Sequence, residues 1–185
     1  MKTILSLFII LLLINSNSNL ETVNYPKAKV SYSDFENLVN EVKAHRKKRL
    51  INLNAFIEKS KGRNTIILDT RSKEMYDKKH LKGAVHLNFS DFTQANLNRI
   101  IPNIETSVLI YCNNNFHGDD IYFATKMVLP KTIDNSTKPL TLALNIPTYI
   151  NLYGYGYKNV YELSELITPF DRRIAYAGST INQKL

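Results

Sequence analysis

Short apolar runs rich in β-branched residues alternate along the chain with segments of helical periodicity, and this alternation constrains the fold most. Buried strands are predicted at Thr65–Asp69, Ala84–Leu87, Val108–Tyr111 and Asn159–Leu163, and helices at residues 72–79, 91–101, 119–129 and 145–154. Runs that are apolar at nearly every position are typical of strands covered on both faces in a parallel sheet. The pattern therefore predicts an α/β domain with a largely parallel sheet.

Capping residues mark where several helices begin. Apolar residues at steps of three and four over residues 35–42 indicate an amphipathic helix capped by Ser31 or Ser33. A second short helix is expected at Leu53–Lys59, before the first buried strand. Asn145 is expected to cap the last of the predicted helices with its side chain.

The N-terminus has the order of a secretory signal. Lys2 is followed by an aliphatic stretch, Ile4–Ile14, and then by small polar residues that include Ser16 and Ser18. The stretch is shorter than the roughly 20 residues that a membrane-spanning helix needs. We therefore expect an exported protein, periplasmic or secreted, with no stable membrane span after cleavage. An uncleaved anchor is the alternative.

The predicted divisions of the chain follow from these patterns. They are a signal peptide (1–18), a leader and helix (19–44), a domain (45–168) and a polar, loosely held C-terminal tail (169–185). The formal net charge is +8, but the lysines are scattered and only residues 45–49 form a basic cluster. No recognised nucleic-acid motif accompanies that cluster, so we expect no nucleic-acid partner.

The chain has one cysteine, Cys112, directly after the predicted strand Val108–Tyr111. The carboxyl ends of the strands are where open parallel sheets place their chemistry. An intrachain disulfide is impossible with a single cysteine, and exported proteins normally use cysteines in pairs. A reactive or sulfur-carrying thiol is therefore the leading interpretation, and a small buried apolar side chain is the alternative.

Three separated segments resemble the rhodanese-like (sulfurtransferase) domain family. The first contains Ile67–Ser72 with Glu74, Tyr76, His80, Gly83 and Ala84, the second is Ile110–Cys112, and the third is Gly154–Leu163. They are similar to the family's "D-x-R-S…E-x-x-x-x-H-x-x-G-A" signature, to its strand ending in the active cysteine, and to its closing "G-[FY]-x-N-V-x-x-L" segment. The resemblance implies a central, mostly parallel sheet with helices on both faces.

The resemblance also implies a site. Cys112 would accept a sulfane sulfur, become a persulfide and pass the sulfur to a thiol or another nucleophile, without a metal or cofactor. Asp69 and Arg71 match positions that support the site's rim. Because the thiolate is the nucleophile, we expect an exposed sulfur with a lowered pKa, ringed by main-chain N–H groups.

The residues after the cysteine are the predicted active-site loop. Asn113, Asn114 and Asn115 suit an anion cradle, since asparagine tolerates left-handed backbone angles. His117 could stabilise the thiolate or move a proton, with a solvated loop histidine as the alternative. Phe116 is a candidate to cover the site.

Two features depart from the family's pattern. The loop lacks the arginine or lysine that active members usually carry, so thiosulfate binding should suffer, and Gly118 stands where a phosphatase would need arginine. The last predicted helix also begins late, which indicates an insertion at residues 116–142 that a protein partner could use.

Three functions stay open. The first is an exported sulfurtransferase or persulfide carrier whose partners are a small sulfane-sulfur donor and a protein thiol or other acceptor. The second is a catalytically weak binding module of the cell envelope that uses the insertion and the basic surface. The third is a thiol redox partner that forms mixed disulfides.

Overall fold

The computed structural model describes residues 24–119 and 143–182 of the chain. The helices are α1 (Tyr32–Lys47), α2 (Leu53–Ser60), α3 (Lys73–Lys78), α4 (Gln94–Ile100), α5 (Asn145–Gly154) and α6 (Ser179–Asn182), with the 3-10 helices η1 (Phe89–Asp91) and η2 (Asn113–Asn115). The strands are β1 (Leu50–Ile51), β2 (Thr65–Asp69), β3 (His80–Leu81), β4 (Ala84–His86), β5 (Ser107–Tyr111), β6 (Val160–Leu163) and β7 (Tyr176–Ala177). Residues 24–31 contain no helix or strand and fall in a unit separate from the one that begins at Tyr32.

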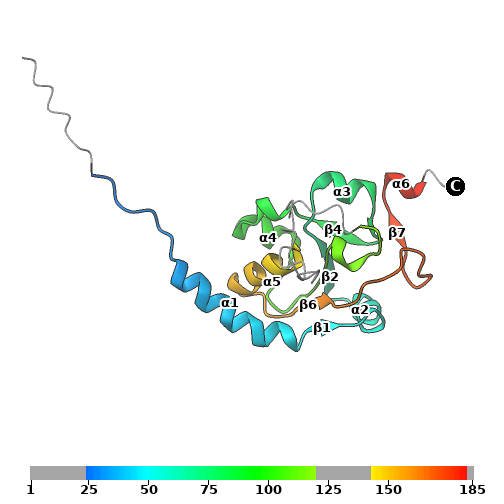
Figure 1. Ribbon diagram of the computed structural model, residues 1–185, viewed down its shortest axis with the longest axis horizontal. Coiled ribbons are helices and arrows are strands. Elements are labelled where there is room, and N and C mark those ends of the chain that lie inside the picture. Colours follow the sequence, from blue (N-terminus) through cyan, green and yellow to red (C-terminus); the bar gives the residue numbers. More distant parts are fainter. Residues whose placement is uncertain (1–23, 120–142, 183–185) are drawn as a thin grey trace, which may run out of the picture. The chain divides into compact units, whose positions relative to one another are not determined.

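The central sheet is parallel. Its strands lie in the order β1-β6-β5-β2-β4, and each neighbouring pair runs in the same direction (Figure 1). In the register, Asp69 at the end of β2 lies beside Tyr111 at the end of β5 and beside His86 at the end of β4. The predicted α/β class with a mostly parallel sheet is therefore confirmed, and the carboxyl ends of three strands meet at one edge.

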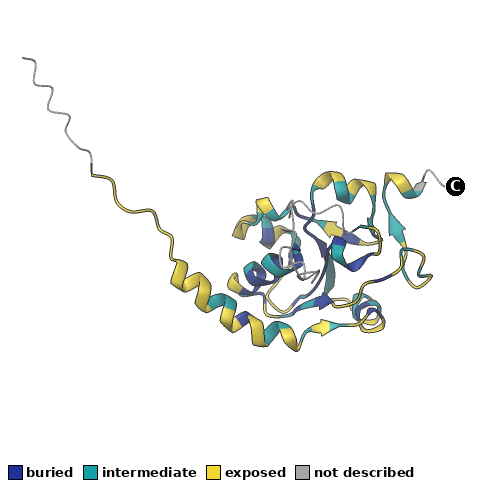
Figure 2. Ribbon diagram, in the orientation of Figure 1, coloured by how far each residue is buried: buried dark blue, intermediate teal, exposed yellow. Residues whose placement is uncertain are grey.

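The side chains of β5 alternate between the two faces of the sheet. Val108 and Ile110 belong to one hydrophobic cluster, and Leu109 and Tyr111 to the other. All four are almost completely buried. In contrast, much of α1 is exposed (Figure 2). A strand buried on both faces needs no polar alternation, which is why its sequence is continuously apolar.

Helices cover both faces of the sheet. The first cluster takes residues from α1, α4 and α5, for example Val42, Leu97 and Leu152. The second takes Leu53 and Phe56 of α2 and packs Tyr76 of α3 against them. The two sets lie on opposite sides of the sheet (Figure 1), so the rhodanese-like layering expected from the sequence is confirmed.

Side-chain caps begin three of these helices, and at α4 the Thr93 hydroxyl accepts from the Asn96 main-chain N–H. Asn52 accepts a hydrogen bond from the Ala55 main-chain N–H at the start of α2, and Ser72 accepts one from Met75 at the start of α3. The cap predicted at Asn145 is wrong. Leu144 occupies the capping position of α5, and the Asn145 amide donates to Glu162 Oε1 at 2.5 Å instead. A hydrogen bond to a carboxylate is charge-assisted, and this one fixes the Asn145 side chain on Glu162.

The C-terminal tail is not loosely held. Strand β7 pairs antiparallel with β3, and Thr180 Oγ1 donates to the Lys78 carbonyl at 2.7 Å. Gly178 has φ +124°, and an added Cβ there would overlap the Lys78 carbonyl oxygen. The tail therefore approaches the end of α3 more closely than any residue with a side chain would allow. The polar composition of the tail did not indicate this docking. The docking depends on backbone pairing and on a glycine rather than on a large apolar face.

Several predictions fall outside the described residues. These are the signal peptide at 1–18, the helix at 119–129 apart from its first residue, and the insertion at 116–142 beyond Asp119. Contacts continue beyond the predicted domain limits of 45 and 168, because α1 packs on α5 and β7 pairs with β3. Within the ranges 24–119 and 143–182, no helix combines the length and apolar character needed to cross a bilayer.

Candidate active site

Cys112 lies at the carboxyl edge of the sheet. Strand β5 ends at Tyr111, and Cys112 keeps an extended backbone, with φ −146° and ψ 178°, before η2 begins. The thiol is therefore placed beside the end of β2, where Asp69 is found. This is the position that the sequence predicts for it.

Main-chain N–H groups from two distant segments are directed at the Cys112 sulfur. Asn113 and Asn114 follow it in η2, and Leu144 stands at the start of α5. The first N–H groups of a helix have no partner within the helix, so the start of α5 can donate to a buried acceptor. The ring of main-chain donors expected from the sequence is present, and the Leu144 N–H is a member that the sequence did not indicate.

The expected exposure and lowered pKa of the thiol are wrong for this structure. Cys112 is only 2% exposed. Burial raises the pKa of Cys112, and the three N–H groups and the positive charge of Arg71 offset only part of that rise. A thiolate in a low-dielectric site needs more compensation than these groups supply. Cys112 therefore rests as a thiol.

Asn113 and Asn115 act through their side chains, and none of the three asparagines adopts a left-handed backbone angle. They form a right-handed 3-10 turn, and the positive φ of the loop, +83°, falls at Gly118. Asn115 Oδ1 accepts from the Cys112 main-chain N–H at 2.9 Å, and its Nδ2 donates to the carbonyls of Leu163 and Glu165. Asn115 thus fixes the cysteine to the end of β6.

Arg71 and Asp69 form a buried ion pair next to the loop. Arg71 Nη2 lies 2.6 Å from Asp69 Oδ2, and the two side chains are 3% and 0% exposed. Arg71 also donates to Asn113 Oδ1 at 2.7 Å and to the Lys79 carbonyl at 2.7 Å. Burial lowers the pKa of Arg71, but the hydrogen bond and charge of Asp69 outweigh it, so the guanidinium stays charged.

Tyr111 completes the network behind the cysteine. Its hydroxyl donates to Asp69 Oδ2 at 2.5 Å and accepts from the Leu81 main-chain N–H at 3.1 Å. Burial, and then the negative charge of Asp69, raise the pKa of Tyr111 well above its usual value. The tyrosine is therefore a neutral donor, and Asp69 is held by two side chains. The apolar strand pattern gave no signal of this role.

Phe116 and His117, which follow η2, lie in different surroundings. Phe116 is 1% exposed and packs edge-on against Tyr111 and Tyr176 in the second hydrophobic cluster. The prediction that Phe116 covers the site is wrong, because a bridge between Phe116 and Ile167 turns the ring into the core. His117 is exposed, with its main-chain N–H bonded to Ile167, and its role towards the thiolate stays a prediction.

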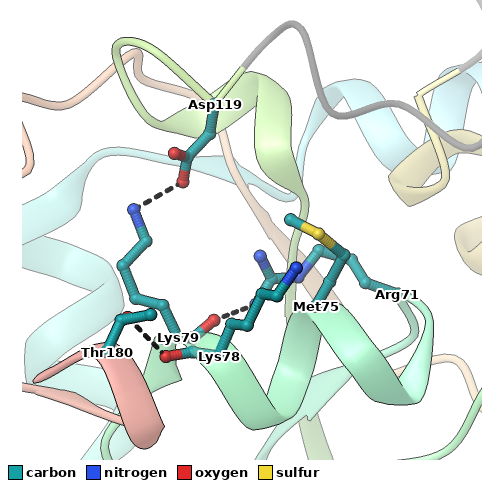
Figure 3. A pocket seen from close by; sticks show the side chains of 6 residues that line it. All are labelled: Arg71, Met75, Lys78, Lys79, Asp119 and Thr180. Carbon is teal, nitrogen blue, oxygen red and sulfur yellow. Dashed lines mark hydrogen bonds and ion pairs between the residues drawn. The ribbon is translucent and has the colours of Figure 1, made fainter. Parts of the chain in front are cut away.

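A cavity of about 260 Å³ opens beside Arg71 (Figure 3). We name it the Arg71 cavity, and its lining residues are Arg71, Met75, Lys78, Lys79, Asp119 and Thr180. The Lys79 ammonium points at Asp119, with 2.7 Å between Nζ and Oδ2. This ion pair ties the end of the cysteine loop to the residue that follows α3. No local pattern in the sequence indicates a role for Lys79, because the pair joins positions 40 apart.

A second cavity of about 260 Å³ lies at the other side of the loop. We name it the Arg46 cavity, and its lining includes Arg46, Asn114, Asn115, Asn145 and Glu162. Elsewhere in the described ranges, no group of three or more histidine, cysteine, aspartate or glutamate side chains is arranged to hold a metal ion.

Two solved structures are similar to this chain. A rhodanese with anions from E. coli is 15% identical, and the match covers 62% of this chain and 99% of that one with a TM-score of 0.38. The BH2092 protein from Bacillus halodurans is 18% identical, with 67% and 74% covered and a TM-score of 0.40. No curated protein matches the chain.

The sequence profile of the family described as "Rhodanese-like domain" matches residues 52–165. This range is more than half of the chain. It begins at the cap of α2, contains Cys112 and both cysteine-loop neighbours of the sulfur, and ends just after β6. The matched segment thus includes the carboxyl ends of β2, β4 and β5 beside the thiol, and the chain belongs to the rhodanese-like domain family.

Proposed function

We propose that the protein is a sulfurtransferase in which Cys112 carries the sulfur as a persulfide. The observation that supports this most is the convergence of the Asn113, Asn114 and Leu144 N–H groups on the Cys112 sulfur. Main-chain N–H groups directed at one point favour an anion there. A buried cysteine with no chemical role would need no such donors, since a thiol accepts hydrogen bonds only weakly.

The transfer step conserves oxidation state. The Cys112 thiol loses its proton to solvent, and the thiolate attacks the terminal sulfur of an organic persulfide, R–S–SH. A new S–S bond forms on Cys112 as the donor's own S–S bond breaks. The R–S⁻ group leaves with the electron pair and takes up a proton, so the products are a cysteine persulfide and a free thiol.

Such a donor suits this site better than thiosulfate does. Thiosulfate is a dianion that needs charge-assisted hydrogen bonds near the reacting sulfur. The loop Asn113–Gly118 contains no arginine or lysine that could donate such bonds next to the sulfur. An organic persulfide releases one thiolate, R–S⁻, so its reaction needs fewer charge-assisted hydrogen bonds from the loop.

Mass spectrometry of the intact protein tests the proposal. The purified chain is mixed with an inorganic polysulfide, an organic persulfide or thiosulfate, and Cys112→Ser is treated in parallel. We expect one added sulfur on the wild type with the first two donors, removed by a free thiol, and none on Cys112→Ser. An added sulfur that persists in Cys112→Ser would overturn the assignment.

The burial of Cys112 favours a second candidate function, a binding module that keeps the fold and an unreactive thiol. At 2% exposure and with a raised pKa, the sulfur is neither accessible nor ionised at rest. If no donor adds sulfur to the wild type, and iodoacetamide labels the folded protein far more slowly than the unfolded chain at pH 7, the binding module replaces the enzyme.

A further inference from the structure

We propose that the Arg71 cavity binds the anionic group of a small organic persulfide donor or thiol acceptor, such as a carboxylate. This inference rests on the proposed sulfur transfer and names the class of small molecule that takes part in it. Three observations carry it: the charge of the cavity lining, the partial commitment of its basic groups, and the connection between Arg71 and the cysteine loop.

The lining is predominantly basic. Arg71, Lys78 and Lys79 contribute positive charges, and Asp119 contributes the single negative one. Figure 3 shows the Lys79 ammonium directed at Asp119, while the Arg71 guanidinium and the Lys78 side chain lie beside Met75. Three basic side chains therefore face one carboxylate in the lining of the cavity.

The ion pair between Lys78 and Glu74 can be exchanged for a pair with a ligand anion at little cost in free energy. Lys78 Nζ lies 2.6 Å from Glu74 Oε1, but the two side chains are 53% and 74% exposed. Ion pairs this exposed contribute little to stability. Lys78 can therefore turn to a ligand anion at little cost. Glu74 itself does not line the cavity.

Arg71 has a donor left for a ligand. Its hydrogen bonds within the described residues use Nε, both N–H groups of Nη2 and one N–H of Nη1, on Asp69, Lys79 and Asn113. The second N–H of Nη1 is not used by these contacts. Because Arg71 lines the cavity, this N–H of Nη1 can donate to an anion that Lys78 binds.

The cavity is connected to the nucleophile through Arg71. Arg71 Nη1 bonds the side chain of Asn113, the residue directly after Cys112, and the Arg71 charge acts on the thiol. The Met75 thioether offers a polarisable surface for the sulfur or hydrocarbon part of a ligand. At about 260 Å³ the cavity is smaller than those that hold drug-sized molecules, so the ligand is a short one.

Matched donors and a matched control variant test the site. The persulfides of 3-mercaptopropionate and of 3-mercaptopropanol differ only in the carboxylate. We compare their rates of sulfur loading on the wild type, on Lys78→Gln and on Lys73→Gln. Lys73 is the control, because it forms the same kind of exposed i,i+4 pair on α3, with Asp77, and does not line the cavity.

We expect the wild type and Lys73→Gln to prefer the carboxylate donor about three- to fivefold, the effect of one solvent-accessible charge pair. Lys78→Gln should lose this preference by slowing only with the charged donor. An equal preference in Lys78→Gln and the wild type, or none in the wild type, would overturn the site.

A binding experiment separates this failure from failure of the sulfur transfer. The thioether 3-(methylthio)propionate cannot donate sulfur, so its binding does not depend on the reaction. NMR titration should show it perturbing Lys78 and Met75 in the wild type and in Cys112→Ser, with at least threefold weaker binding to Lys78→Gln. Binding without loading overturns only the reaction, and loading without binding overturns only the site.

Discussion

Two arginine–carboxylate pairs flank the cysteine loop, one buried and one partly exposed, and they are built differently. Arg71 and Asp69 are two residues apart and almost wholly buried. Arg71 lines the Arg71 cavity. Arg46 and Glu162 are 116 residues apart, with Nε–Oε2 and Nη2–Oε1 distances of 2.5 and 2.6 Å. The Arg46 side chain is 28% exposed, and both residues line the Arg46 cavity.

The difference lies in what each pair holds together. Arg71–Asp69 fixes local groups at the site: the loop through Asn113, and the residue after α3 through the Lys79 carbonyl. Arg46–Glu162 joins α1 to β6, and Asn145 adds the start of α5 to the same carboxylate. One pair therefore shapes the site, while the other holds in register the elements that bring Leu144 to the sulfur.

The largest effect is expected from breaking the pair beside the cysteine. Arg71→Gln leaves the Asp69 carboxylate, which is fully buried, without its cation. Removing one partner of a buried ion pair typically costs about 3–5 kcal/mol. The free energy of unfolding, measured by urea denaturation, should fall by this amount.

A double variant checks the cause of that loss. Asp69→Asn combined with Arg71→Gln removes both charges, so it should be less destabilised than the sum of the two single variants. Purely additive losses would mean that the two side chains do not stabilise each other.

A smaller loss is expected from the pair on the other side. Arg46→Gln leaves Glu162 with the amide of Asn145 and with water entering where the partly exposed arginine stood. We expect a loss of about 1–3 kcal/mol, the usual penalty for an unsatisfied buried group. The same urea measurement ranks the two variants, and a loss at Arg46 equal to that at Arg71 contradicts the distinction between them.

The smallest expected effect is on the reactivity of the Cys112 thiol, which should respond to the Arg71–Asp69 pair and not to the Arg46–Glu162 pair. Burial raises the pKa of Cys112, so alkylation by iodoacetamide should rise with pH at a midpoint above about 8.5, the value of a free cysteine. Below that midpoint the sulfur is protonated and unreactive. Arg71→Gln removes a charge that lowers this pKa, so it should move the midpoint upward.

Arg46→Gln is the matched comparison, because Arg46 belongs to the other ion pair. Its alkylation midpoint should stay within error of the wild type. A downward shift in Arg71→Gln, or an equal upward shift in both variants, would show that Arg71 has no particular influence on the sulfur.

Much of the fold could be predicted because it is written in local patterns. Strands β2, β4 and β5 match the predicted ranges to within a residue or two, and the helices from α1 to α5 were expected. The two-residue strands β1, β3 and β7 were missed. A pair of residues has no periodicity, and these strands exist only because a partner strand is nearby.

The position of the thiol in the fold could be predicted from the sequence, but its exposure and its pKa could not. Placing Cys112 after a buried strand put it at the carboxyl edge of the sheet, where it is found. Whether that thiol is exposed, and how its pKa moves, depends on the atoms around it. Those include the Leu144 N–H, which lies 32 residues further along the chain and approaches only when α5 packs on the sheet.

The sequence alone determined the order of helices and strands, the parallel sheet and the place of the single cysteine, because apolar periodicity and chain direction are local properties. Only the tertiary structure decided the burial of the thiol, the donors around it, the Arg46–Glu162 pair and the docking of the tail on α3. Each of these depends on groups far apart in the chain meeting at hydrogen-bonding distance, and no short stretch of residues encodes such a meeting.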